Sequence, residues 1–219
     1  MSVALRTQII ETAREMNACG LNQGRSGNVS ARQGDGFLIT PSGRDYDTMS
    51  PGEIVAMNFD GSWRGEGVRP SSEWRFHRDI LHHRPDVGAV VHAHPVNATA
   101  LAVHGRGIPP FHYMVAMAGG PTIRCAGYAT FGTQALSDLV LEALEGRTAC
   151  LMAHHGMIAC GPDLGAALGL AIEVETLAAQ YLMAMQLGDP PLLEAAEIDR
   201  VLEKMRAGYG YGSGPEGDA

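Results

Sequence analysis

Residues Val87 to Val96 read Val-Gly-Ala-Val-Val-His-Ala-His-Pro-Val, an apolar run that ends in two histidines and a proline. A nearly continuous apolar run of this length is typical of a strand buried on both faces. Pro95 suits the first turn of a following helix. Alternate residues of a strand share one face, about 6.6 Å apart, so His92 and His94 can bind one metal ion together. A divalent metal held by histidines commonly acts as a Lewis acid, and the stretch therefore predicts catalytic chemistry.

Strands and helices alternate irregularly on either side of this stretch. Because strict strand–helix–strand alternation is absent, we expect an α/β protein of α+β character: a single domain, residues 1–206, with a central mixed, largely antiparallel sheet flanked by helices. Residues 207–219 contain five glycines and two tyrosines and are expected to form a flexible tail. The predicted strands are 29–32, 37–40, 54–59, 87–92, 122–125 and 149–159, the last being one bent strand or a pair interrupted at Gly156. The predicted helices are 3–20, 72–83, 95–103, 133–145, 163–187 and 194–206.

The composition narrows the classes of function. A formal net charge of -8 in 219 residues disfavours nucleic acid and anionic membrane surfaces as partners. The chain has no apolar stretch of about 18 residues, and its N-terminus has no leader-like apolar run, so we expect a cytoplasmic protein. The four cysteines form no C-x-x-C pair and are poor candidates for zinc ligands. Histidines and acidic residues are the better candidates.

A second apolar run, Cys150 to Ala159, again places histidine inside a predicted strand. Adjacent residues of a strand face opposite sides, so only one of His154 and His155 can join the cluster of His92 and His94. The spacing does not choose between them.

Glu73 is the best carboxylate candidate for this site. It follows Ser71 and Ser72 at a predicted helix start, where an acidic side chain can serve as a metal ligand or as a catalytic base. The other interpretation is a capping-box glutamate or a partner of the helix dipole. The sequence pattern leaves both interpretations open.

Three short segments are rich in glycine and hydroxyl groups: Gly24 to Asn28, Thr40 to Gly43, and the pair Ser71 and Ser72. Backbone N–H groups in glycine turns and at a helix N-terminus form a common cradle for anions. Each segment alone is more commonly just a turn. Their association with a predicted metal site points to a phosphorylated substrate.

Taken together, these motifs resemble the class II aldolase and adducin family, and the resemblance extends from about residue 6 to about residue 210. The resemblance implies the fold of that family. The motifs that carry it are Gly20-Leu-Asn-Gln-Gly, Gly27-Asn-Val-Ser, Leu38-Ile-Thr-Pro-Ser-Gly, Pro70-Ser-Ser-Glu-Trp-Arg-Phe-His, Val91-His-Ala-His-Pro, Ile108-Pro, His112-Tyr, Tyr128-Ala-Thr-Phe-Gly-Thr and His154-His-Gly-Met-Ile-Ala-Cys.

The resemblance implies a zinc ion, replaceable by cobalt, manganese or nickel, and a site for dihydroxyacetone phosphate. It further implies a C4 homotetramer with active sites at the subunit interfaces, where Tyr113 comes from the neighbouring subunit. It implies Tyr209, in a flexible tail that can close over the site, as a further catalytic residue, and it implies that Phe131 lines the aldehyde pocket. The implied metal ligands are His92, His94, His155 and Glu73, and the implied phosphate residues are Asn28, Ser42, Gly43, Ser71 and Ser72.

The implied activity is the reversible cleavage of a ketose 1-phosphate, such as L-fuculose 1-phosphate, to dihydroxyacetone phosphate and an aldehyde such as L-lactaldehyde. Glu73 would exchange the proton at the dihydroxyacetone phosphate carbon, and Tyr113 would serve the aldehyde oxygen. The first glycine loop departs from the pattern at Arg25 and Ser26, and Ser42 replaces a threonine. Arg25 either adds a charged phosphate contact or points to solvent. These departures leave the aldehyde unassigned.

Three other activities are compatible with the same scaffold. The nearest is an aldolase for 5-deoxyribulose or 5-methylthioribulose 1-phosphate, which needs the same metal and phosphate residues with a different aldehyde pocket. A pentulose-phosphate epimerase or dehydratase is a more distant alternative. An adducin-like binding module is disfavoured, because such a module has no need for metal ligands together with Glu73 and Tyr113.

Overall fold

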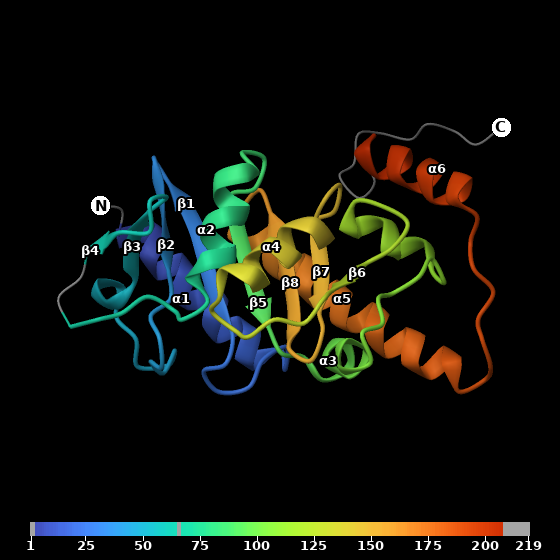
Figure 1. Ribbon diagram of the computed structural model, residues 1–219, viewed down its shortest axis with the longest axis horizontal. Coiled ribbons are helices and arrows are strands. Elements are labelled where there is room, and N and C mark those ends of the chain that lie inside the picture. The colour runs from blue at the N-terminus through green and yellow to red at the C-terminus, as the bar shows by residue number, and fades with distance from the viewer. Residues whose placement is uncertain (1–2, 65–66, 208–219) are drawn as a thin grey trace, which may run out of the picture.

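The computed structural model describes residues 3–64 and 67–207 (Figure 1). Its helices are α1 (Val3–Ala18), α2 (Trp74–His83), α3 (Val96–Val103), α4 (Gln134–Ala143), α5 (Leu164–Met185) and α6 (Ala195–Arg206), with 3-10 turns η1 (Pro51–Glu53) and η2 (Tyr113–Ala118). Its strands are β1 (Asn28–Gln33), β2 (Gly36–Ile39), β3 (Val55–Asn58), β4 (Trp63–Arg64), β5 (Ala89–Ala93), β6 (Arg124–Ala126), β7 (Ala149–Met152) and β8 (Gly156–Gly161). Residues 208–219 of the predicted tail 207–219, with Tyr209 among them, lie outside the described residues.

Within these ranges the strands form one sheet in the order β4-β3-β2-β1-β5-β8-β7-β6. Every neighbouring pair is antiparallel except β6 and β7, which run parallel. The prediction of a central mixed, largely antiparallel sheet is therefore confirmed. The strand with the two histidines, β5, lies in the middle of the sheet between β1 and β8, with Asn28 and Ile158 opposite His92.

Helices cover both faces of the sheet (Figure 1). One core lies between the sheet and α1, α3 and α5, and the other lies under α2 and α4. Along β5 the side chains alternate: Ala89, Val91 and Ala93 belong to the first core, and Val90 belongs to the second. His92 faces the second side, where its ring lies edge-on to Phe76 of α2 at 5.4 Å between centroids. The alternation predicted from the sequence thus places His92 under α2.

Three local predictions need correction, and the 3-10 turn η2 was not predicted. Helix α2 begins at Trp74 with Glu73 as its N-cap residue, so the prediction that Ser71 or Ser72 caps this helix is wrong. Strand β5 ends at Ala93, and His94 follows it. The histidines near residue 154 lie in the turn between β7 and β8 and not inside a strand. The segment 113–118 forms η2, which the apolar periodicity did not indicate.

Helix α5 is the one described helix that is long and apolar enough, by length and composition, to cross a membrane. It packs against β5 and β8 and against α3, and eight of its residues, from Leu164 to Tyr181, are buried. Its apolar character is accounted for by this packing.

Candidate active site

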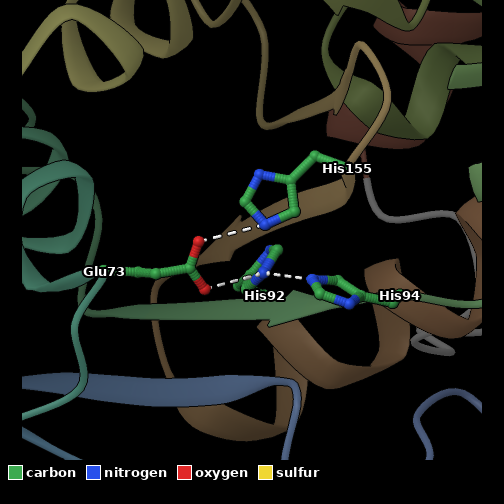
Figure 2. A group of neighbouring side chains, drawn as sticks. All are labelled: Glu73, His92, His94 and His155. Atoms are coloured by element: carbon green, nitrogen blue, oxygen red, sulfur yellow. Dashed lines mark hydrogen bonds and ion pairs between the residues drawn. The ribbon is translucent and has the colours of Figure 1, made fainter. Parts of the chain in front are cut away.

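Four side chains converge from three parts of the chain (Figure 2). Glu73 comes from the start of α2, His92 and His94 from the end of β5, and His155 from the β7–β8 turn. One ligand atom of each lies within 4.8 Å of all the others. The pairing of β5 with β8 brings these segments together, because the antiparallel register sets Ala93 opposite Met157, just after the turn. The structure therefore assembles the four residues that the family resemblance implies.

The conformation of the turn decides which histidine joins the cluster. His154 has a φ of 55°, in the left-handed region that non-glycine residues rarely adopt. Its ring lies edge-on to Tyr128, 5.8 Å between centroids, while His155 reaches Glu73. Gly156 follows, where a Cβ would lie 2.5 Å from the Ala93 carbonyl oxygen and 2.7 Å from His94 Cδ2. Glycine is required here because β5 and the turn approach so closely.

The two oxygens of Glu73 face two imidazoles (Figure 2). Oε2 lies 3.1 Å from His92 Nε2, and Oε1 lies 3.0 Å from His155 Nε2. His94 Nε2 lies 2.9 Å from His92 Nε2. His92 Nδ1 is 2.8 Å from the Met157 carbonyl oxygen, which can only accept a hydrogen bond. Nδ1 of His92 therefore carries a proton, and its Nε2 faces the cluster.

Burial and mutual proximity set the charge states in the cluster. Burial opposes ionisation of Glu73, but the imidazoles of His92 and His155 hold the pKa of its carboxyl well below the usual range. Burial, together with the neighbouring His92 and His155, lowers the pKa of His94 to about 3. At neutral pH the cluster thus offers an ionised carboxylate and a neutral imidazole, the forms in which both groups bind metals.

These residues fit a divalent cation. Glu73 Oε1 is a buried oxygen that makes no hydrogen bond, although His155 Nε2 lies 3.0 Å from it. Such an atom is costly unless a cation or a donor compensates it. Although Glu73 is the N-cap of α2, its side chain makes no capping hydrogen bond, so its interpretation as a capping glutamate is not supported. Three imidazole nitrogens and a carboxylate are a donor set that suits zinc.

The three segments predicted to bind phosphate lie side by side, joined through the buried Thr40. Thr40 N donates to the Val29 carbonyl at 3.0 Å, and its Oγ1 accepts from Val29 N at 3.1 Å. Its carbonyl accepts from Ser71 N at 3.1 Å. Ser42, Gly43 and Ser72 are exposed at the surface of this group, whereas Ser71 and Asn28 are buried beneath it. The arrangement places backbone and hydroxyl donors beside Glu73.

Two of the residues predicted to bind phosphate, Asn28 and Arg25, already make hydrogen bonds within the protein. Asn28 Nδ2 donates to Glu73 Oε2 at 3.0 Å, so its amide supports the carboxylate. Arg25 is exposed, and its Nη1 donates to the Gly43 carbonyl at 2.9 Å. Arg25 therefore neither points freely to solvent nor stands apart from the other loops. Its hydrogen bond connects the loop 24–28 to the loop 40–43, and its exposed side chain places a positive charge beside both loops.

Phe131 lies on the loop 127–133 that follows β6, and 64% of its surface is exposed. The next residue, Gly132, packs so closely that a Cβ would lie 2.7 Å from the Ser72 carbonyl oxygen. Arg75 Nη1 donates to the Gly132 carbonyl at 2.6 Å. The loop is thus fixed against the start of α2 and presents Phe131 near the hydroxyl-rich group.

Tyr113 lies on η2, away from the elements that carry the Glu73–histidine cluster. It begins η2, which packs against α6 and α5, and with Val201, Lys204 and Met205 it lines a cavity of about 170 Å³. In Figure 1 this region lies beside α6, whereas β5 ends near α3 at the lower edge of the sheet. Within one subunit the structure does not bring Tyr113 into the histidine cluster.

Sequence reasoning missed three residues that support the site, namely Ser30, Tyr46 and His77. His77 contacts Ser30 and Asn28, and Tyr46 donates from its hydroxyl to the Gly27 carbonyl. Burial, and secondly the charge of Glu73, raises the pKa of Tyr46. His77 lies four residues after Glu73, so its helical spacing could have indicated a shared face. Tyr46 comes from a loop, and no spacing in the sequence points from it to Gly27.

A family model described as Class II Aldolase and Adducin N-terminal domain matches residues 7–182. The chain belongs to the class II aldolase and adducin family. A 5-methylthioribulose-1-phosphate/5-deoxyribulose-1-phosphate aldolase from Rhodospirillum rubrum is 57% identical over 208 residues, covering 95% of this chain and 93% of that protein. An L-fuculose phosphate aldolase from Escherichia coli strain K12 is 51% identical over 207 residues, covering 94% and 95%. A solved L-fuculose 1-phosphate aldolase matches with a TM-score of 0.91 at 35% identity and covers 94% of this chain and 98% of that one.

Membership in this family, with aldolases as relatives over nearly the full length of both chains, makes the protein a class II aldolase and hence a lyase. The family resemblance and the fold expected from the sequence are confirmed. The aldolase has a possible metal site formed by Glu73, His92, His94 and His155.

Proposed function

We propose that this aldolase reversibly cleaves a ketose 1-phosphate to dihydroxyacetone phosphate and a small aldehyde. The observation that carries the proposal is the juxtaposition of the Glu73–histidine cluster with the hydroxyl-rich group around Thr40. The first suits charge stabilisation at a carbonyl, and the second suits a phosphate a few bonds away. A ketose 1-phosphate carries a carbonyl and a phosphate on neighbouring carbons, so it presents both groups together.

The chemistry is simplest in the direction of synthesis. Glu73 as a carboxylate takes a proton from the hydroxyl-bearing carbon of dihydroxyacetone phosphate, and the electron pair of that C–H bond forms an enediolate. A divalent cation, when bound, supplies Lewis-acid stabilisation of the negative charge on the enediolate oxygen. The enediolate carbon attacks the aldehyde carbon, and Tyr113 donates a proton to the aldehyde oxygen. Cleavage is the reverse of these steps, with the same residues in reversed roles.

Phosphate binding in this proposal involves Ser42, Gly43, Ser71 and Ser72, with Arg25 at the rim and Asn28 next to Glu73. Fixing the phosphate far from the breaking bond holds the reacting carbons in a near-attack geometry. Phe131, exposed on the loop 127–133, is proposed to face the aldehyde. Tyr113 is proposed to act in the site of a neighbouring subunit of a C4 tetramer, since η2 lies away from the cluster in its own subunit. The tail 207–219, with Tyr209, is proposed to cover the site.

Two substrates are candidates. L-fuculose 1-phosphate would yield L-lactaldehyde, in line with the relative from Escherichia coli. A 5-deoxyribulose or 5-methylthioribulose 1-phosphate is the second candidate, because the relative from Rhodospirillum rubrum is more similar, at 57% against 51% identity. We further propose that the native metal is zinc, with cobalt, manganese or nickel as functional substitutes, and that the enzyme works in the cytoplasm.

The substrate test supplies purified enzyme with each of these ketose phosphates and measures dihydroxyacetone phosphate together with the mass of the aldehyde. We expect dihydroxyacetone phosphate from at least one of them, loss of cleavage after dialysis against a chelator, and recovery on adding zinc. Ribulose 5-phosphate serves as the control for epimerase or dehydratase chemistry. An isomerised product without carbon–carbon cleavage, or full activity in metal-free protein, would contradict the proposal.

Arg25 provides a test of the phosphate cradle. Replacing Arg25 with alanine removes a charge from the rim and the hydrogen bond to Gly43. We expect the KM for the ketose phosphate to rise about tenfold while kcat changes less than about twofold, because a charge-assisted contact remote from the reacting carbons contributes to ground-state and transition-state binding alike. Steady-state kinetics measures both constants.

The matched control is Arg44→Ala, next to Gly43. Arg44 is also exposed but pairs with Glu53 at 3.3 Å, so its loss changes the net charge equally without untying the two loops. We expect a near-normal KM for this variant. If both variants raised KM equally, the effect of Arg25 would come from the loss of one positive charge and not from a contact with the phosphate.

A further inference from the structure

A buried chain of hydrogen bonds continues from the cluster into the protein. His77 lies on α2 and is fully buried, as is Ser30 on β1. His77 Nδ1 lies 2.7 Å from Ser30 Oγ, and its Nε2 contacts Asn28 Oδ1. Asn28 and Ser30 are two residues apart on β1 and so share the face under α2. The order of contacts is Ser30, His77, Asn28, Glu73.

The direction of each hydrogen bond follows from Glu73. An ionised carboxylate only accepts, so the Asn28 amide must present its N–H group to Glu73 and its oxygen to His77. That oxygen needs a donor, which must be the N–H at Nε2 of His77. Burial, with the neighbouring His92, lowers the pKa of His77 to about 3, so the ring is neutral and its Nδ1 accepts from the Ser30 hydroxyl. All the donors point toward Glu73.

An asparagine amide has two orientations that differ by exchange of its oxygen and nitrogen. The wrong orientation would set the amide oxygen against the Glu73 carboxylate. It would also set the amide N–H against the N–H at His77 Nε2. We propose that His77 is a positioning residue that fixes the Asn28 amide, and thereby the Glu73 carboxylate, in the geometry required for metal binding and proton transfer. Its effect on proton transfer rests on the proposed function, whereas its effect on metal binding does not.

The test compares His77→Leu, which removes the donor, with His77→Gln, whose amide N–H can reach the position of Nε2. Each variant is loaded with cobalt, and its visible absorption spectrum and its cobalt affinity by chelator competition are recorded. We expect His77→Leu to change the spectrum and to weaken cobalt binding about tenfold or more, as outer residues that orient ligands usually do. We expect His77→Gln to restore most of both. Where the protein cleaves its substrate, His77→Leu should lower kcat with little change in KM.

Leu81→Ala is the matched control, because Leu81 is a fully buried residue of the same helix outside the hydrogen-bond chain. It should lower the unfolding temperature and leave the cobalt spectrum unchanged. Where His77→Leu does not fold, His77→Phe replaces it, since a phenyl ring keeps most of the buried volume and removes the N–H donor to Asn28. A wild-type spectrum in the folded variant, or a failure of His77→Gln to restore it, overturns the proposal.

The outcomes also separate this inference from the proposed function. If the protein cleaves neither ketose phosphate but the cobalt spectra shift as described, the proposed function fails and His77 keeps its role. If cleavage is found and the spectra do not shift, the role of His77 fails and the aldol reaction stands.

Discussion

Glu73→Gln is expected to lower kcat for cleavage of the ketose phosphate by about a thousandfold, which corresponds to about 4 kcal/mol of lost transition-state stabilisation. Glutamine keeps the volume of the side chain but cannot accept the proton from carbon. It also replaces a buried, ionised oxygen donor of the cluster with a neutral amide. Cleavage is measured from the release of dihydroxyacetone phosphate, and metal content is measured on the same sample.

The control for this variant is Glu142→Gln, a charge-matched change at an exposed position on α4. It should retain near-normal activity. Both variants should show the circular dichroism and the molecular mass of the unchanged protein. If Glu73→Gln kept more than about a tenth of the activity, the base would have to be another residue, because general-base contributions are typically at least about a hundredfold.

Mixing two inactive variants, Glu73→Gln and Tyr113→Phe, is expected to restore activity. In the proposed C4 tetramer each site combines Glu73 of one subunit with Tyr113 of its neighbour. A mixed ring therefore contains sites in which both residues are intact. Random assortment of equal amounts gives about a quarter of the sites in that form, far above either variant alone. The experiment refolds the two chains together and compares the activity with that of each variant refolded separately.

Glu73→Gln mixed with His92→Ala supplies the control, because both residues belong to the cluster of a single subunit. Intact sites cannot form by exchange of subunits in that mixture, so no recovery is expected. Native mass spectrometry establishes that mixed tetramers are present in both cases. Mixed tetramers without recovery in the Tyr113 experiment would place Tyr113 outside the neighbouring site.

Much of the fold could be predicted because the central strands are nearly continuous apolar runs. The run from Val87 to His92 predicted a buried strand, and β5 lies in the middle of the sheet. Local periodicity fails where backbone conformation departs from a regular element. The left-handed φ of His154 rotates the turn so that His155 reaches Glu73, and strand alternation carries no information about that rotation.

The candidate site could be predicted as a set of residues but not as a hydrogen-bond network. Spacing indicated His92 and His94, and the position at a helix start indicated Glu73 as the best carboxylate candidate. The family resemblance chose His155 over His154. The bridging amide of Asn28 and the ring of His77 depend on the packing of α2 over β1, two elements separated by more than forty residues. The four-residue spacing from Glu73 to His77 indicates a shared helical face, but no sequence signal shows that the His77 ring contacts Asn28.

The exposed loop 127–133 has a consequence for how this enzyme could be redesigned. The cluster is held by close backbone contacts at Gly156 and by buried hydrogen bonds, so substitutions there disturb the structure as well as the chemistry. Tyr128 and Phe131 each expose 64% of their surface, and their replacement requires no rearrangement of either core. In the proposed function Phe131 faces the aldehyde, so substitutions at this position are expected to change which aldehyde is accepted while the residues for dihydroxyacetone phosphate are retained. The same separation would let natural selection diversify such enzymes at little cost to folding.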